Sequence, residues 1–427
     1  MSANGSIAIT GSGAVCGAGI TIDEIWKALV NGQSAVKEVS SFDASRWPVR
    51  MAAEVTGVDN RTLVEDRKLH KMISKTDMFG LYAARMAIEQ SSLVTYRDSL
   101  PPEAATNFND RTGVFAGSGG GNYSGNYDFF PVLTVAGRDL KKFGNEFSQV
   151  VNPMWLLRHL PNNVLCHVGI RHGFKGTNAC VTNQCAGGVM ALSEAAAAVR
   201  AGEADRAVAV GHDTPFEPET FFNFHILGLL DNQAPRPFDR DRGGTVFGEG
   251  AAAVIFEKAD DAKARQATIF GEFLGSGCVT EGMGVLEVRA DGDGLSRAIE
   301  LALADAGLKA ADVGMVVAHG NGTPASDASE ARAIKRVFGS SVPPVTSFKW
   351  AYGHLIAASG VIDLVLALRA LREGIVPGIA TLKTPDPEFS PFPVSAQPQQ
   401  PRSDVALILC RGFGAMNIAL LVRAPRA

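Results

Sequence analysis

The sequence has few charged residues, few cysteines and no long apolar run, and each shortage excludes a class of protein. Only 20% of the 427 residues are charged and the net charge is −4, so we expect no nucleic-acid binding. The six cysteines lack paired spacing, which argues against a disulfide framework or a zinc site, and we predict no bound metal. Free cysteines are typical of a reducing compartment.

No uninterrupted apolar run reaches the length of a membrane-spanning helix. The first six residues also lack the basic and apolar regions of a signal peptide. We therefore predict a cytoplasmic protein that does not enter the membrane. With 46% hydrophobic residues, the chain is long enough for one large core or for two fused halves.

Short apolar runs alternate with helical patterns, which predicts an α/β protein with parallel sheets covered by helices. The expected strands are 7–10, 113–116, 207–211, 252–256, 313–318, 406–409 and 417–422. The expected helices are 23–30, 77–90, 186–201, 295–306, 328–338 and 356–373. Residues 122–160 have little periodicity but many aromatic side chains, among them Tyr123 and Trp155, and a loop this long is expected to be functional or at an interface.

Cys185 lies where an extended segment that begins near Gly176 gives way to an alanine-rich helix. Unpaired backbone N–H groups and the positive end of the helix dipole favour a thiolate at such a position. We therefore predict a lowered pKa for Cys185 and a nucleophile suited to acyl transfer. The other five cysteines are expected to be inert residues in or near the core.

Two histidines and a lysine follow other apolar strands. His319 comes directly after the strand expected at 313–318, so it is presented at the carboxyl end of that strand. Lys349 and His354 flank a second junction, which leads into the helix expected at 356–373. Because open α/β sheets gather such strand ends at one crevice, the cysteine and the two histidines are expected to share a pocket.

These motifs resemble those of the β-ketoacyl synthases, the condensing enzymes of the thiolase superfamily. The resemblance is closest to the acyl-carrier-protein-dependent fatty acid (KAS II-like) and type II polyketide branch. It extends over nearly the whole chain, through segments 7–13, 26–34, 236–250 and 412–417, and several ordered motifs are a strong signal. It implies a thiolase-like fold of two stacked βαβαβαββ halves in a layered α-β-α-β-α sandwich. Residues 1–260 would carry the cysteine and residues 261–427 the histidines.

The resemblance also implies a role for each candidate residue. Cys185 would be the acylated nucleophile, and His319 and His354 the catalytic histidines of a decarboxylative Claisen condensation with malonyl-acyl carrier protein. The implied supporting residues are the charged pair Lys349 and Glu330, the gate Phe413, whose N–H joins that of Cys185 in an oxyanion hole, and Thr323 and Asn417. Glu330 has an alternative interpretation as an ordinary first-turn carboxylate stabilised by the helix dipole.

No bound cofactor is implied, since the substrate travels on the phosphopantetheine of an acyl carrier protein. Carrier proteins are acidic, so the basic cluster of Arg67, Lys68, Lys71 and Lys75 is a candidate docking surface, with solvated helix charge as the alternative. In the family, the region equivalent to 122–160 supports the dimer and the acyl pocket. We therefore expect a homodimer, or a heterodimer with a related ketosynthase-like or chain-length-factor subunit.

The chain departs from the usual family pattern at Gln184, Asn321, Arg411 and Met416, and in the segment 275–294. Gln184 stands where a small residue is usual, and Cys410-Arg411 replaces a small and aromatic pair. These departures favour a specialised polyketide or polyene pathway over housekeeping lipid synthesis alone. Two other functions remain as alternatives, a noncatalytic chain-length-factor-like subunit and a degradative coenzyme A thiolase. The thiolase is disfavoured because Cys410 lacks a Cys-Gly-Gly pattern.

Overall fold

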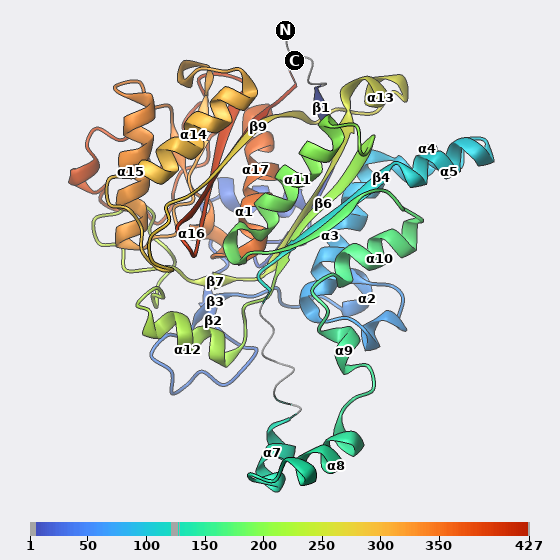
Figure 1. Cartoon of the computed structure of the whole chain (residues 1–427). Coiled ribbons are helices and arrows are strands. Elements are labelled where there is room, and N and C mark those ends of the chain that lie inside the picture. Colours follow the sequence, from blue (N-terminus) through green and yellow to red (C-terminus); the bar gives the residue numbers. More distant parts are fainter. Residues whose placement is uncertain (1–5, 121–126, 128, 426–427) are drawn as a thin grey trace.

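The computed structural model describes residues 6–120, 127 and 129–425, and Figure 1 shows strands at its centre with helices around them. Within these residues, ten strands form one sheet in the order β11-β10-β12-β13-β9-β1-β8-β6-β4-β5. At its middle, β1 pairs with β9 only over Ile7 to Ile9. The sheet therefore consists of two five-stranded halves joined along a short seam.

The first half-sheet comes entirely from residues before position 260. Its strands are β1 (Ile7–Cys16), β4 (Thr112–Ser118), β5 (Asn178–Thr182), β6 (Arg206–Asp213) and β8 (Gly250–Lys258). β4 is parallel to β5 and β6, whereas β8 is antiparallel to β1 and β6. Nearly every residue of β4, β6 and β8 is buried, because both faces of this half are covered.

The second half-sheet comes entirely from residues after position 260. Its strands are β9 (Gly271–Thr280), β10 (Met315–Val317), β11 (Val345–Thr346), β12 (Val405–Gly412) and β13 (Met416–Arg423). β10 is parallel to β11 and β12, but β13 is antiparallel to β9 and β12. The expectation of parallel sheets is therefore wrong for part of each half. In β12 and β13 the reason is a turn of residues 413–415, since only antiparallel strands can share so short a connection.

Helices cover the outer faces of both half-sheets and fill the space between them (Figure 1). α3 (Lys75–Ser91) packs on β1, β6 and β8, and α14 (Asp293–Ala306) packs on β9 and β13. α11 (Gly187–Arg200) and α17 (Ser359–Glu373) contact each other between the halves, with α11 on β4 and β6 and α17 on β8 and β12. This succession of layers is the α-β-α-β-α sandwich predicted from the sequence.

Other elements surround this core. They are β2 (Lys37–Glu38), β3 (Met51–Ala53), β7 (Phe247–Gly248), α1 (Ile22–Val30), α2 (Asn60–Leu63), α4 (Leu93–Asp98), α5 (Pro102–Asp110), α10 (Asn163–His172), α12 (Pro218–Ile226), α13 (Ala259–Ala264), α15 (Pro324–Phe338) and α16 (Lys349–Tyr352). Among the helices of the described residues, none has both the length and the apolar character that a membrane span requires.

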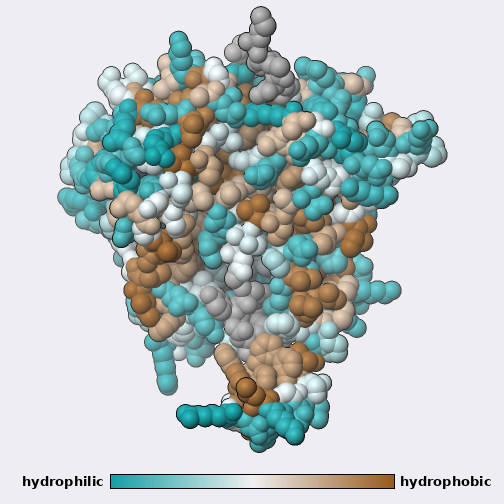
Figure 2. Space-filling view, viewed as in Figure 1, coloured by the Kyte–Doolittle hydropathy of each residue, from teal (hydrophilic) through white to brown (hydrophobic). Residues whose placement is uncertain are grey.

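The segment between β4 and α10 differs most from its prediction. Instead of an irregular loop, the described part of 122–160 contains α7 (Phe130–Ala136), α8 (Leu140–Val150) and α9 (Trp155–Arg158). α7 and α8 form an arm below the layered body (Figure 1), and Figure 2 shows hydrophobic side chains on its surface. Phe130, Leu133 and Leu140 are exposed there. Tyr123, singled out from the sequence, lies outside the described residues.

The sequence pattern also does not predict β9, because three glycines interrupt it. Two of them, Gly275 and Gly277, are required by close packing against α14 rather than by a turn. A Cβ atom at Gly277 would lie 2.1 Å from the Ala298 carbonyl oxygen, and one at Gly275 would lie 2.7 Å from the Ala306 nitrogen. Glycine thus lets a helix lie directly on the strand.

Candidate active site

A cavity of about 180 Å³ lies where β10 and β12 end and where α11 begins. Cys185, His319 and His354 all line it, as do Thr323 and Phe413. Two hollows of about 350 and 340 Å³ occur elsewhere, but neither contains a cysteine or a histidine. The chemistry of its lining, and not its volume, therefore identifies the candidate site.

Cys185 lies in a single 3₁₀ turn between β5 and α11, which begins at Gly187. The preceding residue, Gln184, has a φ of 42°, a left-handed conformation that is costly for a side chain of this kind. The hairpin of β12 and β13 lies against this turn. A Cβ atom added at Gly412 would be 3.8 Å from Cys185 Cβ. Cys410 donates its S–H to the Cys185 carbonyl oxygen at 3.3 Å.

The predicted lowering of the Cys185 pKa is wrong for the resting protein. Burial raises the pKa of the Cys185 thiol to about 12, and the negative charge of Asp213 raises it further. Lys349 acts in the opposite direction but does not compensate. The local backbone that suggested a thiolate is therefore outweighed by the loss of solvent around the sulfur. Cys185 rests as a neutral thiol.

His319 follows β10 and is 2% exposed. The backbone N–H of Arg411, on β12, donates to His319 Nδ1 at 3.3 Å. Because a backbone amide can only donate, Nδ1 must be the unprotonated nitrogen, and the ring proton lies on Nε2.

His354 follows α16 and is 3% exposed. Its Nδ1 accepts the N–H of Ile356 at 3.1 Å and lies 2.9 Å from Ser359 Oγ. The Ser359 oxygen itself accepts the N–H of Leu355 at 2.9 Å, so its hydroxyl proton is available for Nδ1. His354 therefore also carries its proton on Nε2.

The two imidazoles face each other with ring centroids 5.2 Å apart and planes at 79°. Burial lowers the pKa of each ring well below the usual value, and the positive charge of Lys349 lowers both further. Two neutral rings with fixed tautomers thus provide two N–H donors. From the sequence we expected only that the two histidines share a pocket with Cys185, and the cavity contains all three.

The predicted charged pair of Lys349 and Glu330 is wrong. Lys349 Nζ instead pairs with Asp363 Oδ2 of α17 at 3.1 Å, and both side chains are 1% exposed. Glu330, on α15, accepts the backbone N–H groups of His319 at 2.7 Å and Gly320 at 2.9 Å. The carboxylate fixes the turn that presents His319, because two charge-assisted hydrogen bonds hold its backbone.

Sequence comparison decides the family. The pattern of the beta-ketoacyl synthase N-terminal domain matches residues 4–262, and that of the C-terminal domain matches residues 270–383. The chain belongs to the β-ketoacyl synthase family. The 3-oxoacyl-[acyl-carrier-protein] synthase 2 of Synechocystis is 32% identical over 422 residues, covering 97% of both chains. The protein of that name from Coxiella burnetii is 31% identical, covering 97% of this chain and 98% of its own.

Solved structures agree with this assignment. A β-ketoacyl synthase from Burkholderia phymatum has a TM-score of 0.86 at 26% identity, covering 99% of this chain and 100% of its own. A chain from the solved complex of a type II polyketide acyl-carrier protein with its ketosynthase matches with a TM-score of 0.85, at 26% identity and the same coverage. An ishigamide ketosynthase/chain length factor shares the fold, with a TM-score of 0.87 at 24% identity. The family resemblance and the thiolase-like fold predicted from the sequence are confirmed.

The other supporting residues of this β-ketoacyl synthase also lie at the cavity or next to it. Phe413 lines the cavity and packs on Phe224, with ring centroids 5.3 Å apart. Thr323 is held by Asn321, whose Oδ1 accepts its N–H and its hydroxyl. Asn417 is fully buried behind the cavity wall.

The candidate docking residues separate into two kinds. Arg67, Lys68 and Lys71 are exposed at the surface. Lys75 Nζ, in contrast, lies 2.6 Å from Oε1 of Glu249, whose side chain is fully buried. Lys75 is itself exposed but compensates a buried charge, and its part in docking stays a prediction.

Sequence reasoning missed the residues that hold the histidines and Lys349. Asp363 pairs with Lys349 and accepts the hydroxyl of Tyr352 at 2.6 Å, and Ser359 holds His354. A signal was present, since Asp363 is a lone acid in an otherwise apolar stretch of α17. Acids are almost never fully buried unless they are paired, which predicts a partner for Asp363.

Proposed function

We propose that this β-ketoacyl synthase joins an acyl chain held on Cys185 to malonyl-acyl carrier protein, with loss of carbon dioxide. One observation carries the proposal: Cys185 shares a cavity with two neutral imidazoles whose N–H donors have fixed tautomers. The synthase and ketosynthase names of the relatives support the same reaction class.

In the first half-reaction, the Cys185 sulfur attacks the carbonyl carbon of the carrier-bound thioester. A new S–C bond forms, the carrier S–C bond breaks, and the thiol proton leaves on the carrier thiol. The backbone N–H groups of Cys185 and Phe413 are the proposed donors to the oxyanion. One such donor lowers a barrier by about 3 kcal/mol.

In the second half-reaction, the malonyl thioester places its carbonyl oxygen between the imidazoles of His319 and His354. Their Nε2–H groups stabilise the enolate that remains when the bond to carbon dioxide breaks. The carbanion then attacks the acyl carbon on Cys185, and the released thiolate takes up a proton. Neutral rings suit this role, because they donate without holding the substrate carboxylate as an ion pair.

The substrate arm is proposed to be the phosphopantetheine of the carrier protein. The outer part of the cavity is apolar, with Leu227, Leu229, Val285 and Leu286 in its lining, which suits an extended thin chain. Arg67, Lys68 and Lys71 remain the proposed contacts for an acidic carrier. A fatty acid pathway and a type II polyketide or polyene pathway both use this chemistry.

The proposed assembly is a homodimer, or a heterodimer with a related ketosynthase-like subunit. The exposed apolar side chains of α7 and α8 support a partner at the arm, since contiguous exposed apolar surface marks interaction sites. Sedimentation of the purified chain, alone and with a co-expressed candidate subunit, distinguishes the two assemblies. The cytoplasmic location stays a prediction that cell fractionation tests.

Intact-protein mass spectrometry with acyl carrier proteins tests the proposal. Incubation with an acyl carrier should add the acyl mass to the chain, and malonyl carrier should then remove it. The Cys185→Ala variant should take up nothing, whereas Cys278→Ala, which removes an exposed thiol, should load normally. If the unaltered chain forms no adduct with any carrier, a noncatalytic chain-length-factor-like role replaces this proposal.

A further inference from the structure

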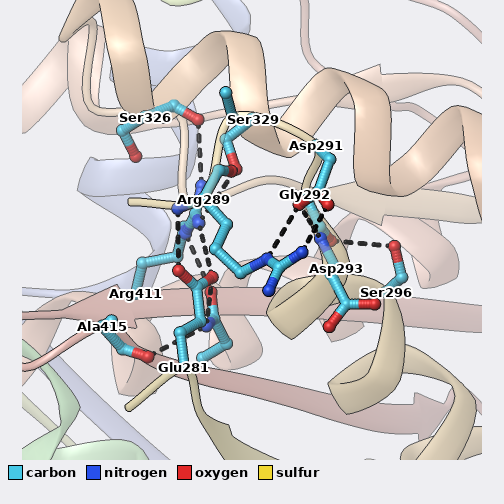
Figure 3. A network of polar contacts seen from close by, with 12 residues as sticks. Glu281, Arg289, Asp291, Gly292, Asp293, Ser296, Ser326, Ser329, Arg411 and Ala415 are labelled. Carbon is cyan, nitrogen blue, oxygen red and sulfur yellow. Dashed lines mark hydrogen bonds and ion pairs between the residues drawn. The ribbon is translucent and has the colours of Figure 1, made fainter. Parts of the chain in front are cut away.

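Arg411 is a buried cation beside the catalytic cavity, with a side chain that is 6% exposed. Its guanidinium donates from Nε to Asn417 Oδ1 at 2.9 Å and from Nη1 to the Ser326 carbonyl at 3.0 Å. Nη2 donates to Ser329 Oγ at 3.1 Å, and Ser329 in turn donates to the Arg289 carbonyl at 2.6 Å. Figure 3 shows these contacts converging on one guanidinium.

Glu281 is the acid that compensates this cation. Its side chain is fully buried, and Oε1 lies 3.5 Å from Arg411 Nη2 and 3.0 Å from Asn417 Nδ2. Figure 3 shows Glu281 beside Arg411. Oε2 accepts the backbone N–H of Arg289 at 2.8 Å. A Cβ atom at Gly294 would lie 2.6 Å from Glu281 Oε1, so the glycine leaves the room that the carboxylate fills. The pair is therefore built into the fold.

Glu281 and Arg289 belong to one segment, residues 281–292, which we name the wall loop. Val285, Leu286 and Val288 of this loop line the catalytic cavity. The N–H of Gly414 fixes the loop at the Val285 carbonyl, at 2.7 Å. The cluster around Arg411 fixes the loop at Glu281 and again at Arg289, through the carbonyl and N–H of the latter.

The same arginine reaches the catalytic centre through its backbone, because its N–H holds His319 Nδ1. β12 thus places the main chain of Arg411 at the histidine and its side chain at the wall loop. Arg411 and the segment 275–294 are also two places where the sequence departs from the usual family pattern. Although 130 positions separate them along the chain, they meet at this ion pair.

We propose that Arg411 is a positioning residue, whose guanidinium holds the wall loop in place as the outer side of the cavity that receives the carrier-bound substrate. Only the kinetic part of this inference rests on the proposed condensing function. The wall loop contributes apolar contacts to the substrate arm, so displacement of the loop weakens substrate binding. The hydrogen bond from the backbone of position 411 to His319 persists in any variant that keeps the backbone.

The first experiment measures hydrogen exchange in the wall loop of the resting protein. Arg411→Met leaves Glu281 as a buried carboxylate without its cation, so we expect exchange in 281–292 to become about tenfold faster. The double variant Arg411→Met/Glu281→Met removes both charges and should return exchange toward the original rate, because an apolar pair replaces an ion pair at little cost. Arg297→Met, which removes an exposed arginine of α14, should change nothing.

The second experiment measures condensation kinetics. Arg411→Met should raise KM for malonyl carrier protein about tenfold while kcat stays within about threefold, since substrate contacts are lost and His319 keeps its donor. A merely structural role would reduce the amount of folded enzyme, and so lower kcat, without raising KM. Unchanged wall-loop exchange in Arg411→Met, or a double variant no better than the single one, would overturn the inference. Exchange needs no substrate, so it remains decisive where Cys185 takes no acyl group.

Discussion

His319 and His354 lie with ring centroids 5.2 Å apart, and each accepts a backbone N–H at Nδ1. Both rings therefore direct a proton from Nε2, and neither has a free lone pair on that nitrogen. This relationship suits the stabilisation of an enolate oxygen and not the removal of a proton by Nε2. Because backbone amides can only donate hydrogen bonds, their placement at Nδ1 of each ring keeps that nitrogen unprotonated.

Replacement of Lys349 by methionine should alter the pH dependence of decarboxylation. Lys349 lowers the pKa of both histidines, and its loss leaves Asp363 without its cation, so both pKa values should rise toward 6.5. Protonation removes the neutral rings that the proposed mechanism uses. The acid limb of the pH–rate profile should therefore move to higher pH. Carbon dioxide release measured from pH 5 to 8 checks this. Lys383→Met, which removes an exposed lysine, should keep the original profile.

Ser359→Ala should slow carbon dioxide release about tenfold, which corresponds to one neutral hydrogen bond of about 1.4 kcal/mol. The variant removes the hydroxyl beside His354 Nδ1 and leaves the N–H of Leu355 without its acceptor. KM for the malonyl carrier should stay unchanged, because the hydroxyl lies on the side of the ring away from the cavity. Ser403→Ala, at a half-buried site that does not line the cavity, is the control. A rise in KM with constant kcat would contradict this role.

Asp213→Asn should make Cys185 more reactive. Burial raises the pKa of Asp213 to about 7, so above that pH its negative charge opposes ionisation of the Cys185 thiol. Removing the charge should lower the pKa of Cys185 and speed its alkylation by iodoacetamide at pH 8 by roughly threefold. Mass spectrometry of the Cys185 peptide, in a Cys278→Ala background, provides the rate. The difference from the parent should disappear near pH 5, where Asp213 of the parent is protonated and as uncharged as the asparagine of the variant.

Lys75→Met should destabilise the fold by about 1 to 2 kcal/mol, less than a fully buried pair because Lys75 is partly exposed. Burial raises the pKa of Glu249 and Lys75 lowers it, so the variant raises that pKa further. A carboxyl with a raised pKa in the folded state costs nothing while it is protonated and destabilises the fold as pH rises and it must ionise. The loss of stability in the variant should therefore be larger at pH 8 than at pH 5. Urea unfolding at both pH values measures it.

Lys71→Met is the matched comparison for Lys75. Lys71 is exposed, and its removal should change stability by no more than about 0.5 kcal/mol. It should instead weaken binding of an acidic carrier protein, with a greater effect at low salt. Equal destabilisation by the two variants would show that the ion pair with Glu249 has no special value.

Local sequence patterns pointed to the candidate catalytic residues because the positions of these residues depend on neighbours close in the chain. Cys185 and His319 each follow an extended run and precede a helix, and that local change of structure is visible in the chain. The pairing of Lys349 with Asp363 was missed because it depends on how α16 packs against α17. Predictions failed likewise for β9, where glycine serves helix packing, and for α8, a helix in which no residue is buried by the described part of the chain.

The amino-acid sequence by itself determined the family and the layered α/β fold and singled out Cys185, His319 and His354 as candidate catalytic residues, since motif order and apolar periodicity are properties of the chain alone. Only the tertiary structure decided the protonation of those residues and the partners of the buried charges. Burial and long-range electrostatics set both, and they depend on which segments meet, as Arg411 and Glu281 do at the cavity wall.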